Sequence, residues 1–338
     1  MKDKSLLWKI PFLVFLIVGT ILIIRQQQSI PYHKSADLIF GTGYHVTYQC
    51  DSDLTQSIKA ELMKVDYSLS PFNEQSIITA INQNQQVKPD TMFMDVFNLA
   101  MQISDDTDGA FDITVAPLVN AWGFGFKNGQ HPTKFQVDSL RKIIGYQKVF
   151  YDGGYIKKKD PRIMLDCSAI AKGYGSDVVA KLLRSRGVKN FMVEIGGEIV
   201  TSGVNEKRLP WKIGVTKPTE DPLNTSHELQ SVLNVTDKAM ATSGNYRNFY
   251  YKDGKRYAHT IDPKTGYPVQ HNILSATVIA NSCAMADAYA TSFMVMGLEK
   301  AQQVLSRHPE LMAYLIYSDK DGKNAVWYTP SLKDKIEQ

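Results

Sequence analysis

Residues 282–297 form the stretch that most restricts how this chain can fold. The sequence, SCAMADAYATSFMVMG, is apolar at most positions and ends on Gly297, a residue type that commonly terminates helices. A helix that is apolar on nearly all sides has to be buried, so we expect the rest of the chain to pack around it. Asp287 and Thr291 are the exceptions, and their i, i+4 spacing places both side chains on one face.

The pair formed by Asp287 and Thr291 allows two interpretations. A carboxylate and a hydroxyl on one helix face offer oxygen ligands of the kind that Mg²⁺ prefers. Alternatively, Asp287 lies in the first helical turn, where a negative charge interacts favourably with the helix dipole, and Thr291 donates to the main chain of its own helix. These residues alone leave both interpretations open.

A second apolar stretch, residues 10–24, lies near the N-terminus and carries no charge. Counted from Leu6, it is about long enough to cross the roughly 30 Å hydrocarbon core of a bilayer. Lysines at positions 2, 4 and 9 precede it, whereas Arg25 is the basic residue that directly follows it. This asymmetry predicts a cytoplasmic N-terminus and a body on the other side of the membrane.

We therefore divide the chain into a membrane anchor at residues 1–24, a polar tether at residues 25–36 and a folded domain at residues 37–330. A cleaved signal peptide is the alternative to the anchor, but no A-x-A-like cleavage site follows the apolar run. No cysteine directly follows the run either, which argues against a lipoprotein.

Composition sets limits on the class of protein. With 43% hydrophobic and 21% charged residues, the chain has the composition of an ordinary globular protein. Its net charge of +4 is spread out and forms no basic stripe, so nucleic acid is not an expected partner. The three cysteines are far apart and form no CxxC motif, which argues against a zinc site or a disulfide framework. We expect them to be small buried apolar residues.

The remaining pattern mixes long helical stretches with hairpins and alternating strands. Asp152, Gly153 and Gly154, for example, separate two short strands in a way typical of a hairpin. The chain has no internal repeat of about 20 to 50 residues and no coiled-coil pattern. These features predict an α+β fold with antiparallel sheets and packed helices rather than a doubly wound fold.

Two further segments are candidates for ligand binding. Residues 163–166 predict a strand that ends on Asp166, and small residues then turn the chain into a helix that runs to Arg186. Such a turn can present helix N–H groups to a phosphate, although a plain connection between strand and helix is the alternative. His259 stands before a Pro-Lys-Thr-Gly turn, so we expect it at a strand end, where it either reaches a cleft or is structural.

Six motifs, in this order along the chain, resemble those of the ApbE family, the FAD:protein FMN transferases. They are GAFDITVAPLV at residues 109–119, LDCSAIAKGY at 165–174, VEIGGE at 193–198, ATSGNY at 241–246, HTIDPKTGYP at 259–268 and ADAYAT at 286–291. Each motif is weakly specific when taken alone, whereas six in family order are a specific signal.

The resemblance implies a T-fold-like α+β architecture that holds FAD in a cleft and depends on Mg²⁺. It implies transfer of FMN from FAD to a Thr or Ser hydroxyl of a target protein, with formation of a phosphoester and release of AMP. The implied targets are flavoprotein subunits of membrane redox complexes. The implied location is the bacterial cytoplasmic membrane, with the catalytic domain on the periplasmic side, which agrees with the charge pattern around residues 10–24.

The same resemblance implies roles for particular residues. The metal would be held by Asp287, Thr291 and the main-chain oxygen of Ala169, and His259 would act in the transfer. The flavin contacts would be Phe40, Ala110, Phe111, Asp112, Asp166, Lys172 and Ile261. Phe40 departs from the family, which often has Met at this position, and Cys167 stands where a larger apolar residue is common.

The chemistry of pyrophosphate cleavage agrees with these implied roles. The phosphate oxygens need positive charge beside them, and a Mg²⁺ ion held by few protein ligands keeps positions open for them. Asp287 is a poor base while it binds metal, because the cation lowers its pKa. The reference pKa of histidine is about 6.5, so His259 suits the removal of the hydroxyl proton better.

Two other functions compete with the transferase. If water replaces the target hydroxyl, the same site is a Mg²⁺-dependent FAD pyrophosphatase, and the sequence does not separate these two enzymes. The other alternative is a non-catalytic FAD-binding protein. The intact Asp287, Thr291 and His259 argue against it, because binding alone has little need for a metal site and a base.

Overall fold

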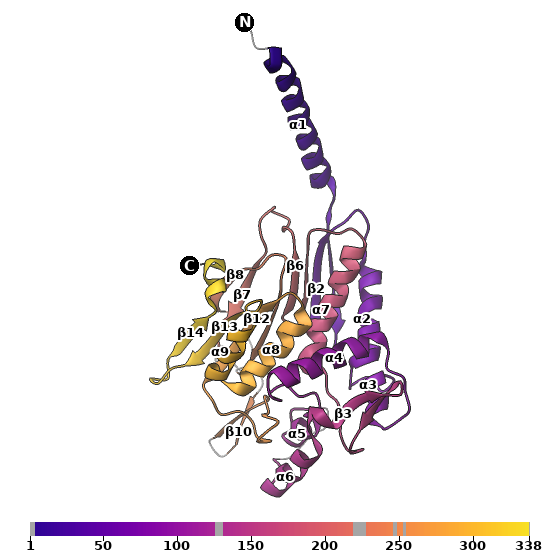
Figure 1. The fold of residues 1–338 in the computed structure, drawn as a ribbon, viewed down its shortest axis with the longest axis vertical. Helices are drawn as coiled ribbons and strands as arrows, with labels where there is room; N and C mark the ends of the chain where they lie inside the picture. Colours follow the sequence, from indigo (N-terminus) through magenta and orange to yellow (C-terminus); the bar gives the residue numbers. More distant parts are fainter. Residues whose placement is uncertain (1–3, 126–130, 219–227, 246–248, 253–254, 338) are drawn as a thin grey trace.

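The computed structural model describes residues 4–125, 131–218, 228–245, 249–252 and 255–337. Figure 1 shows a folded body of sheets and helices, from which helix α1 (Lys4–Ser29) extends away. An antiparallel sheet of eight strands forms the centre of this body. Its strands, in spatial order, are β1 (Tyr32–Ile39), β2 (Thr42–Gln49), β5 (Phe191–Ile195), β6 (Glu198–Ser202), β9 (Ala239–Gly244), β12 (Ile273–Ala280), β13 (Met312–Ser318) and β14 (Asn324–Tyr328).

Three smaller antiparallel sheets accompany the main one. They consist of β15 (Ile336–Glu337), β8 (Leu229–Asn234) and β7 (Lys212–Thr216), of β3 (Val149–Asp152) with β4 (Tyr155–Lys158), and of β10 (Phe249–Lys252) with β11 (Lys255–Ala258). The remaining helices are α2 (Thr55–Leu69), α3 (Ile77–Asn82), α4 (Thr91–Asp106), α5 (Ala116–Ala121), α6 (Lys134–Ile143), α7 (Ser168–Ser185), α8 (Cys283–Met296) and α9 (Leu298–Arg307). Two 3₁₀ turns, η1 (Tyr146–Lys148) and η2 (Pro330–Lys335), complete the described elements. The predicted α+β class with antiparallel sheets is thereby confirmed.

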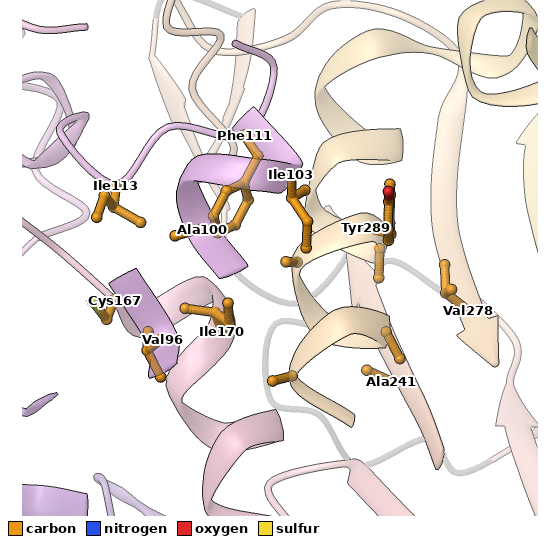
Figure 2. Packing of buried hydrophobic residues seen from close by; sticks show 14 of the residues in the cluster. Val96, Ala100, Ile103, Phe111, Ile113, Cys167, Ile170, Ala241, Val278 and Tyr289 are labelled. Atoms are coloured by element: carbon orange, nitrogen blue, oxygen red, sulfur yellow. The ribbon is translucent and has the colours of Figure 1, made fainter. Parts of the chain in front are cut away.

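The main sheet separates two apolar layers because alternate side chains of a strand point to opposite faces. In β12, Val278 belongs to the core shared with helices α4, α7 and α8, whereas the next residue, Ile279, packs with β7 and β8. The helices therefore cover one face of the sheet and the three-stranded sheet covers the other. Figure 2 shows the helical side, where Val96, Ile170 and Tyr289 from three different helices meet in one core.

Helix α8 is the central element of the helical layer, as its composition predicted. Ten of its residues are buried, and the Ser282 hydroxyl caps its N-terminus by accepting from the Met285 N–H. Asp177 of α7 adds to this cap, because its carboxylate accepts from the Ser282 hydroxyl and from the N–H groups of Cys283 and Ala284 at 2.8–2.9 Å. Burial raises the pKa of Asp177 in spite of these donors.

Two predicted features of the backbone have a different structure. The structure assigns no strand to residues 163–166, so this prediction was wrong. Asn82 of α3 explains the difference, because its side chain donates to the Leu165 carbonyl at 2.9 Å and accepts from the Leu165 N–H at 2.7 Å. The Asp166 N–H donates to the Ile113 carbonyl at 2.8 Å. A side chain and a loop therefore take the hydrogen bonds that a neighbouring strand would otherwise make.

The segment expected to be a tether is the second difference. Residues 25–29 continue α1, and residues 32–36 belong to β1, which pairs with β2 from Tyr32 to Ile39. Most of residues 25–36 are therefore helix and edge strand. Within the parts of the chain that the structure describes, no helix is both long and apolar enough to cross a membrane.

The expectation for the cysteines is met by two of the three. All three are free thiols, and Cys167 and Cys283 are buried. Cys50, which follows β2, is half-buried. The Cys283 backbone also marks where α7 and α8 cross most closely, since a Cβ placed on Gly173 would stand only 2.4 Å from the Cys283 carbonyl oxygen.

We predict that Gly173→Ala destabilises the protein, because backbone atoms cannot move aside as a flexible side chain can. The free energy of unfolding should fall by about 1–3 kcal/mol, the usual range for forcing an extra carbon into a packed core. Denaturant unfolding followed by circular dichroism measures this. Gly43→Ala is the control, since a Cβ there meets only the His45 ring at 3.8 Å. Equal stability of the two variants would contradict the close crossing.

A second prediction concerns a charged cluster that joins α4, α8 and α9. The Asp106 carboxylate accepts from the Tyr289 hydroxyl at 2.9 Å, and His308 lies 3.1 Å from Asp106 and 2.8 Å from Glu310. Burial disfavours the charged imidazole, but the hydrogen bonds to Glu310 and Asp106 outweigh it and raise the pKa of His308. A raised pKa means that the folded state binds the proton more tightly than the unfolded state does.

The stabilisation by His308 should therefore be complete below the unfolded pKa of about 6.5 and be lost as pH rises through the folded pKa. Denaturant unfolding of the wild type and of His308→Gln across pH 5 to 9 measures this loss. The difference in unfolding free energy between the two proteins should shrink above about pH 6.5. A difference that stays constant with pH would show that the ion pairs with Asp106 and Glu310 do not stabilise the fold.

Candidate active site

A cavity of about 590 Å³ lies between helices α7 and α8, strands β7 and β9 and several loops. This volume is within the range of ligand-binding cavities, roughly 300–1,000 Å³. Its walls come from the loop before α5, the start of α7, the turn between β5 and β6, the strands β7 and β9, the segment after β11 and the inner face of α8. Segments that are far apart in the sequence therefore form one concave surface.

Most residues singled out from the sequence lie on this surface. The ten that line the cavity are Ala110, Phe111, Asp112, Asp166, Ala169, Lys172, His259, Ile261, Asp287 and Thr291. Phe40 is not among the lining residues. It stands in the turn between β1 and β2, where its φ is +53°, and its ring packs against α7 at Gly175. Phe40 thus does not lie on the cavity wall, and its contact with a flavin stays a prediction.

Asp287 and Thr291 do share one face of α8, and both line the cavity. The first turn of α8 contains no acidic residue, so Asp287 lies too deep in the helix for an interaction with its N-terminal dipole. Asp287 is 3% exposed, and its carboxylate accepts from the Gly173 N–H at 3.1 Å. The Thr291 hydroxyl lies 3.1 Å from the Ser243 hydroxyl of β9. Both side chains therefore point away from their own helix and into the cavity.

The start of α7 brings main-chain groups to the same surface. The Asp166 carboxylate accepts from the Ser168 N–H at 2.8 Å and so fixes the turn that begins the helix. Ser168, Ala169 and Lys172 of this first part of α7 line the cavity. A helix N-terminus with an ammonium beside it favours an anionic group. Residues 163–166 are not the strand of the predicted layout, whereas the turn and the helix that follow it are present.

Lys172 lies between two buried carboxylates. Its ammonium is 2.9 Å from Glu198, whose side chain is only 4% exposed. Burial alone would lower the pKa of Lys172, but the charges of Asp287 and Glu198 raise it well above its usual range. Glu198 belongs to the VEIGGE motif, yet sequence reasoning did not single it out. The sequence feature that could have identified Glu198 is the Gly196-Gly197 pair directly before it. Such a pair predicts a tight turn, and the turn fixes the direction of the first side chain of the following strand.

The two carboxylates of this group resist ionisation. Burial and the neighbouring Asp287 raise the pKa of Glu198 to about 8, although Lys172 acts in the other direction. Burial also raises the pKa of Asp287, against the effects of Lys172 and of the Gly173 N–H. Two carboxylates share one ammonium, so one negative charge is left uncompensated when both are ionised. A divalent cation beside Asp287 would compensate it.

The loop before α5 is held by Asp112. One of its oxygens accepts from the Thr114 N–H and hydroxyl at 2.8 and 2.6 Å, and the other accepts from the Tyr146 N–H at 3.0 Å. Burial raises the pKa of Asp112 in spite of these donors. Asp112 therefore shapes the wall formed by Ala110 and Phe111.

His259 follows β11, as predicted for a residue at a strand end. It lines the cavity, and its ring stands edge-on to Phe124 with 6.4 Å between the ring centroids. The next residue, Thr260, donates to the Asn245 side chain at 2.6 Å, which ties this segment to the end of β9. Trp122 ties the loop after α5 to the same region, because its indole N–H donates to the Gly266 carbonyl at 2.8 Å.

Within the described residues, no group of three or more His, Cys, Asp or Glu side chains is placed to hold a metal ion. A cation at Asp287 would therefore depend on hydroxyl and main-chain oxygens as further ligands. The Thr291 hydroxyl and the Ala169 carbonyl, which belong to residues that line the same cavity, are oxygen donors of the kind that Mg²⁺ accepts.

Comparisons with known proteins point to one family. The model of the ApbE family matches residues 40–316. An FAD:protein FMN transferase from Vibrio cholerae is 38% identical over 293 residues, which cover 83% of this chain and 86% of the relative. The FAD:protein FMN transferase of Escherichia coli K12 is 35% identical over 291 residues, with coverage of 83% and 81%.

Solved structures give the same result. The flavin transferase ApbE from Vibrio cholerae superposes with a TM-score of 0.82 at 34% identity, over 90% of this chain and 99% of the other. The apo form of the Pseudomonas stutzeri flavinyl transferase ApbE superposes with a TM-score of 0.80 at 29% identity, over 90% and 97% of the two chains. The arrangement of sheets and helices around the cavity is thus shared with these flavin transferases.

Proposed function

The chain belongs to the ApbE family, and from this premise we propose how its cavity carries out flavin transfer. The predicted membership is confirmed, and the protein is an enzyme, an FAD:protein FMN transferase that uses FAD as its substrate. The single observation that carries the proposal is that Asp287, Thr291, Lys172 and the start of α7 converge on one cavity.

The proposed reaction is a phosphoryl transfer. The hydroxyl oxygen of a Thr or Ser in the target protein attacks the FMN-side phosphorus of the FAD pyrophosphate. The bond between this phosphorus and the oxygen that bridges to AMP breaks, a phosphoester forms on the target, and AMP leaves. The hydroxyl proton passes to a base on the enzyme. In such a reaction the protein mainly aligns the attacking hydroxyl with the phosphorus and compensates the negative charge of the phosphate oxygens. It does not need to form a covalent bond to the substrate.

Mg²⁺ fits the residues of the cavity. Asp287 is buried, and the group that it forms with Lys172 and Glu198 holds one negative charge in excess when both carboxylates are ionised. Asp287, Thr291 and the Ala169 carbonyl would hold the ion. When bound, it supplies positive charge beside the phosphate oxygens.

Lys172 and the first turn of α7 bind the pyrophosphate in this proposal. The ammonium and the positive end of the α7 dipole lie on the same wall, so both favour an anion that enters the cavity. Phe111, Ala110 and Ile261 supply apolar surface on which a flat ring system can pack. Asp112 and Asp166 support the walls through the hydrogen bonds described above.

His259 acts as the base that receives the hydroxyl proton. It is the described histidine that lines the cavity, and it stands on a segment separate from α7 and α8. This placement lets a target hydroxyl lie between His259 and the phosphate. Asp287 takes part in catalysis through the metal rather than as the base, because a bound cation stabilises its ionised form.

Helix α1 supports a membrane location for the enzyme. Its large apolar side chains from Ile10 to Ile23 are exposed, and they are Ile10, Phe12, Leu13, Val14, Phe15, Leu16, Ile17, Val18, Ile21, Leu22 and Ile23. We infer that α1 attaches the enzyme to the bacterial cytoplasmic membrane with its domain on the periplasmic side. Flavoprotein subunits of membrane redox complexes are then within reach as targets.

One experiment separates the transferase from its alternatives. The full chain is mixed with FAD, Mg²⁺ and a candidate flavoprotein subunit, and the subunit is weighed by mass spectrometry. A mass gain equal to one FMN, with release of AMP, supports transfer. Free FMN and an unmodified subunit would indicate a Mg²⁺-dependent FAD pyrophosphatase, and intact FAD would indicate a binding protein.

Asp287→Ala should reduce the rate of FMN transfer by about 100-fold or more, because it removes the one charged ligand of the proposed metal. Initial rates of target labelling with FAD and Mg²⁺ measure this loss. Asp177→Ala is a useful comparison, since it removes a buried carboxylate that caps α8 outside the cavity lining. Transfer by Asp287→Ala at the wild-type rate would reject the metal assignment.

His259→Ala should lower the transfer rate by roughly 100- to 10,000-fold, the usual contribution of a positioned base, while FAD still binds. Single-turnover labelling gives the rate, and quenching of flavin fluorescence gives the FAD affinity. His33→Ala serves as the control, because His33 bonds to the Cys50 carbonyl at 3.0 Å and does not line the cavity. An unchanged rate in His259→Ala would refute the role as base.

A further inference from the structure

Glu198 is a buried carboxylate to which the proposed reaction assigns no step. It begins β6 directly after the Gly196-Gly197 turn and lines the cavity. Its main chain is held to α7 because the Ser176 hydroxyl donates to the Glu198 carbonyl at 3.0 Å. One carboxylate oxygen lies 2.9 Å from the Lys172 ammonium. The other oxygen is buried and has no hydrogen-bond partner in the described part of the chain.

The position of Lys172 follows from this turn. A Cβ placed on Gly196 would lie 3.3 Å from Cδ of Lys172, so the lysine side chain passes closely over the turn before it reaches Glu198. The φ of +60° at Gly196 allows this tight geometry. Lys172 thus extends along the β5–β6 turn toward a carboxylate of the sheet.

Asp287 competes with Glu198 for the same ammonium. Both carboxylates interact electrostatically with Lys172, but the ion pair forms with Glu198. The Asp287 carboxylate instead accepts from the Gly173 N–H, one residue after Lys172. The ion pair of the ammonium is thus with Glu198, whereas Asp287 acts on the ammonium through its charge.

We propose that Glu198 is a positioning residue that holds the Lys172 ammonium beside the β5–β6 turn, so that the Asp287 oxygens stay free for a divalent cation. This inference rests on the metal site of the proposed function. Without the Glu198 charge, Asp287 is the remaining buried carboxylate that attracts Lys172. An ammonium bound to Asp287 would compete directly with a metal ion, because both need the same oxygens.

The test measures Mg²⁺ binding to the full chain, without FAD, by isothermal titration calorimetry at one fixed pH. Glu198→Gln keeps the size of the side chain and removes its charge. It should weaken Mg²⁺ binding by about tenfold or more, because the Lys172 ammonium is then free to pair with the Asp287 oxygens that the metal ion needs. Thermal unfolding in the absence of Mg²⁺ verifies that the variant is folded.

A second variant separates this electrostatic role from a structural one. Adding Lys172→Met to Glu198→Gln removes the competing ammonium while a side chain of similar length stays in place. The double variant should regain Mg²⁺ affinity to within about threefold of the wild type, although it should bind FAD more weakly because Lys172 is lost. Damage to the shape of the site would not be repaired in this way.

Glu61→Gln is the matched control. Glu61 also pairs with a lysine, Lys64, at 2.7 Å, but this pair lies on the exposed surface of α2 and outside the cavity. The same chemical change there should leave Mg²⁺ affinity and FMN transfer unaltered, as expected for an exposed ion pair.

Three results would overturn the inference. If Glu198→Gln binds Mg²⁺ as tightly as the wild type, or if the double variant does not recover, Glu198 does not act through Lys172, and the proposed function is untouched. If the wild-type chain itself does not bind Mg²⁺, the inference fails together with the metal site of the proposed function. In that case, labelling of the target in the presence of a chelator shows whether the transferase reaction itself depends on a metal.

Discussion

The close crossing of α7 and α8 is the contact on which the site depends. Gly173 lets the two backbones approach so closely that a Cβ at this position would clash with the Cys283 carbonyl. Because of this approach, the Gly173 N–H reaches the Asp287 carboxylate, and Asp177 reaches the first N–H groups of α8. The start of α7 and the polar face of α8 therefore lie on the same cavity. A wider crossing would separate the first turn of α7 from Asp287.

A second constraint is the cost of buried charge. Placing Asp287, Glu198 and Lys172 together in a poorly solvated site costs several kcal/mol for each ion unless partners compensate it. Burial raises the pKa of both carboxylates, and the neighbouring Asp287 raises the pKa of Glu198 further. A protein selected for stability alone would favour apolar side chains here. The ligands proposed for this cavity, a metal ion and a pyrophosphate, would account for these charges.

The sheet and the loops contribute in different ways. The eight-stranded sheet forms one side of the cavity, where the paired strands β6 and β9 supply Glu198 and Ser243. The walls with Phe111 and His259 stand on loops instead, and each loop is tied down by buried hydrogen bonds, such as those of Asp112 and Trp122. In the proposed reaction, the metal and phosphate groups would therefore bind regular elements, whereas the flavin and the target hydroxyl would face loops, which differ more easily in shape.

Local sequence determined the elements and much of the chemistry of this protein. Residues 282–297 are apolar on nearly all sides of the helix, which predicted that the helix is buried. The spacing of Asp287 and Thr291 predicted that both lie on one face, and six short motifs identified the family. Only the tertiary structure decided which partners these residues meet. Leu165 bonds to the Asn82 side chain instead of to a neighbouring strand. The Phe40 ring packs against α7, and the Lys172 ammonium pairs with Glu198 rather than with Asp287. Periodicity and motifs describe neighbours along the chain, whereas burial and electrostatics depend on segments that meet only after folding.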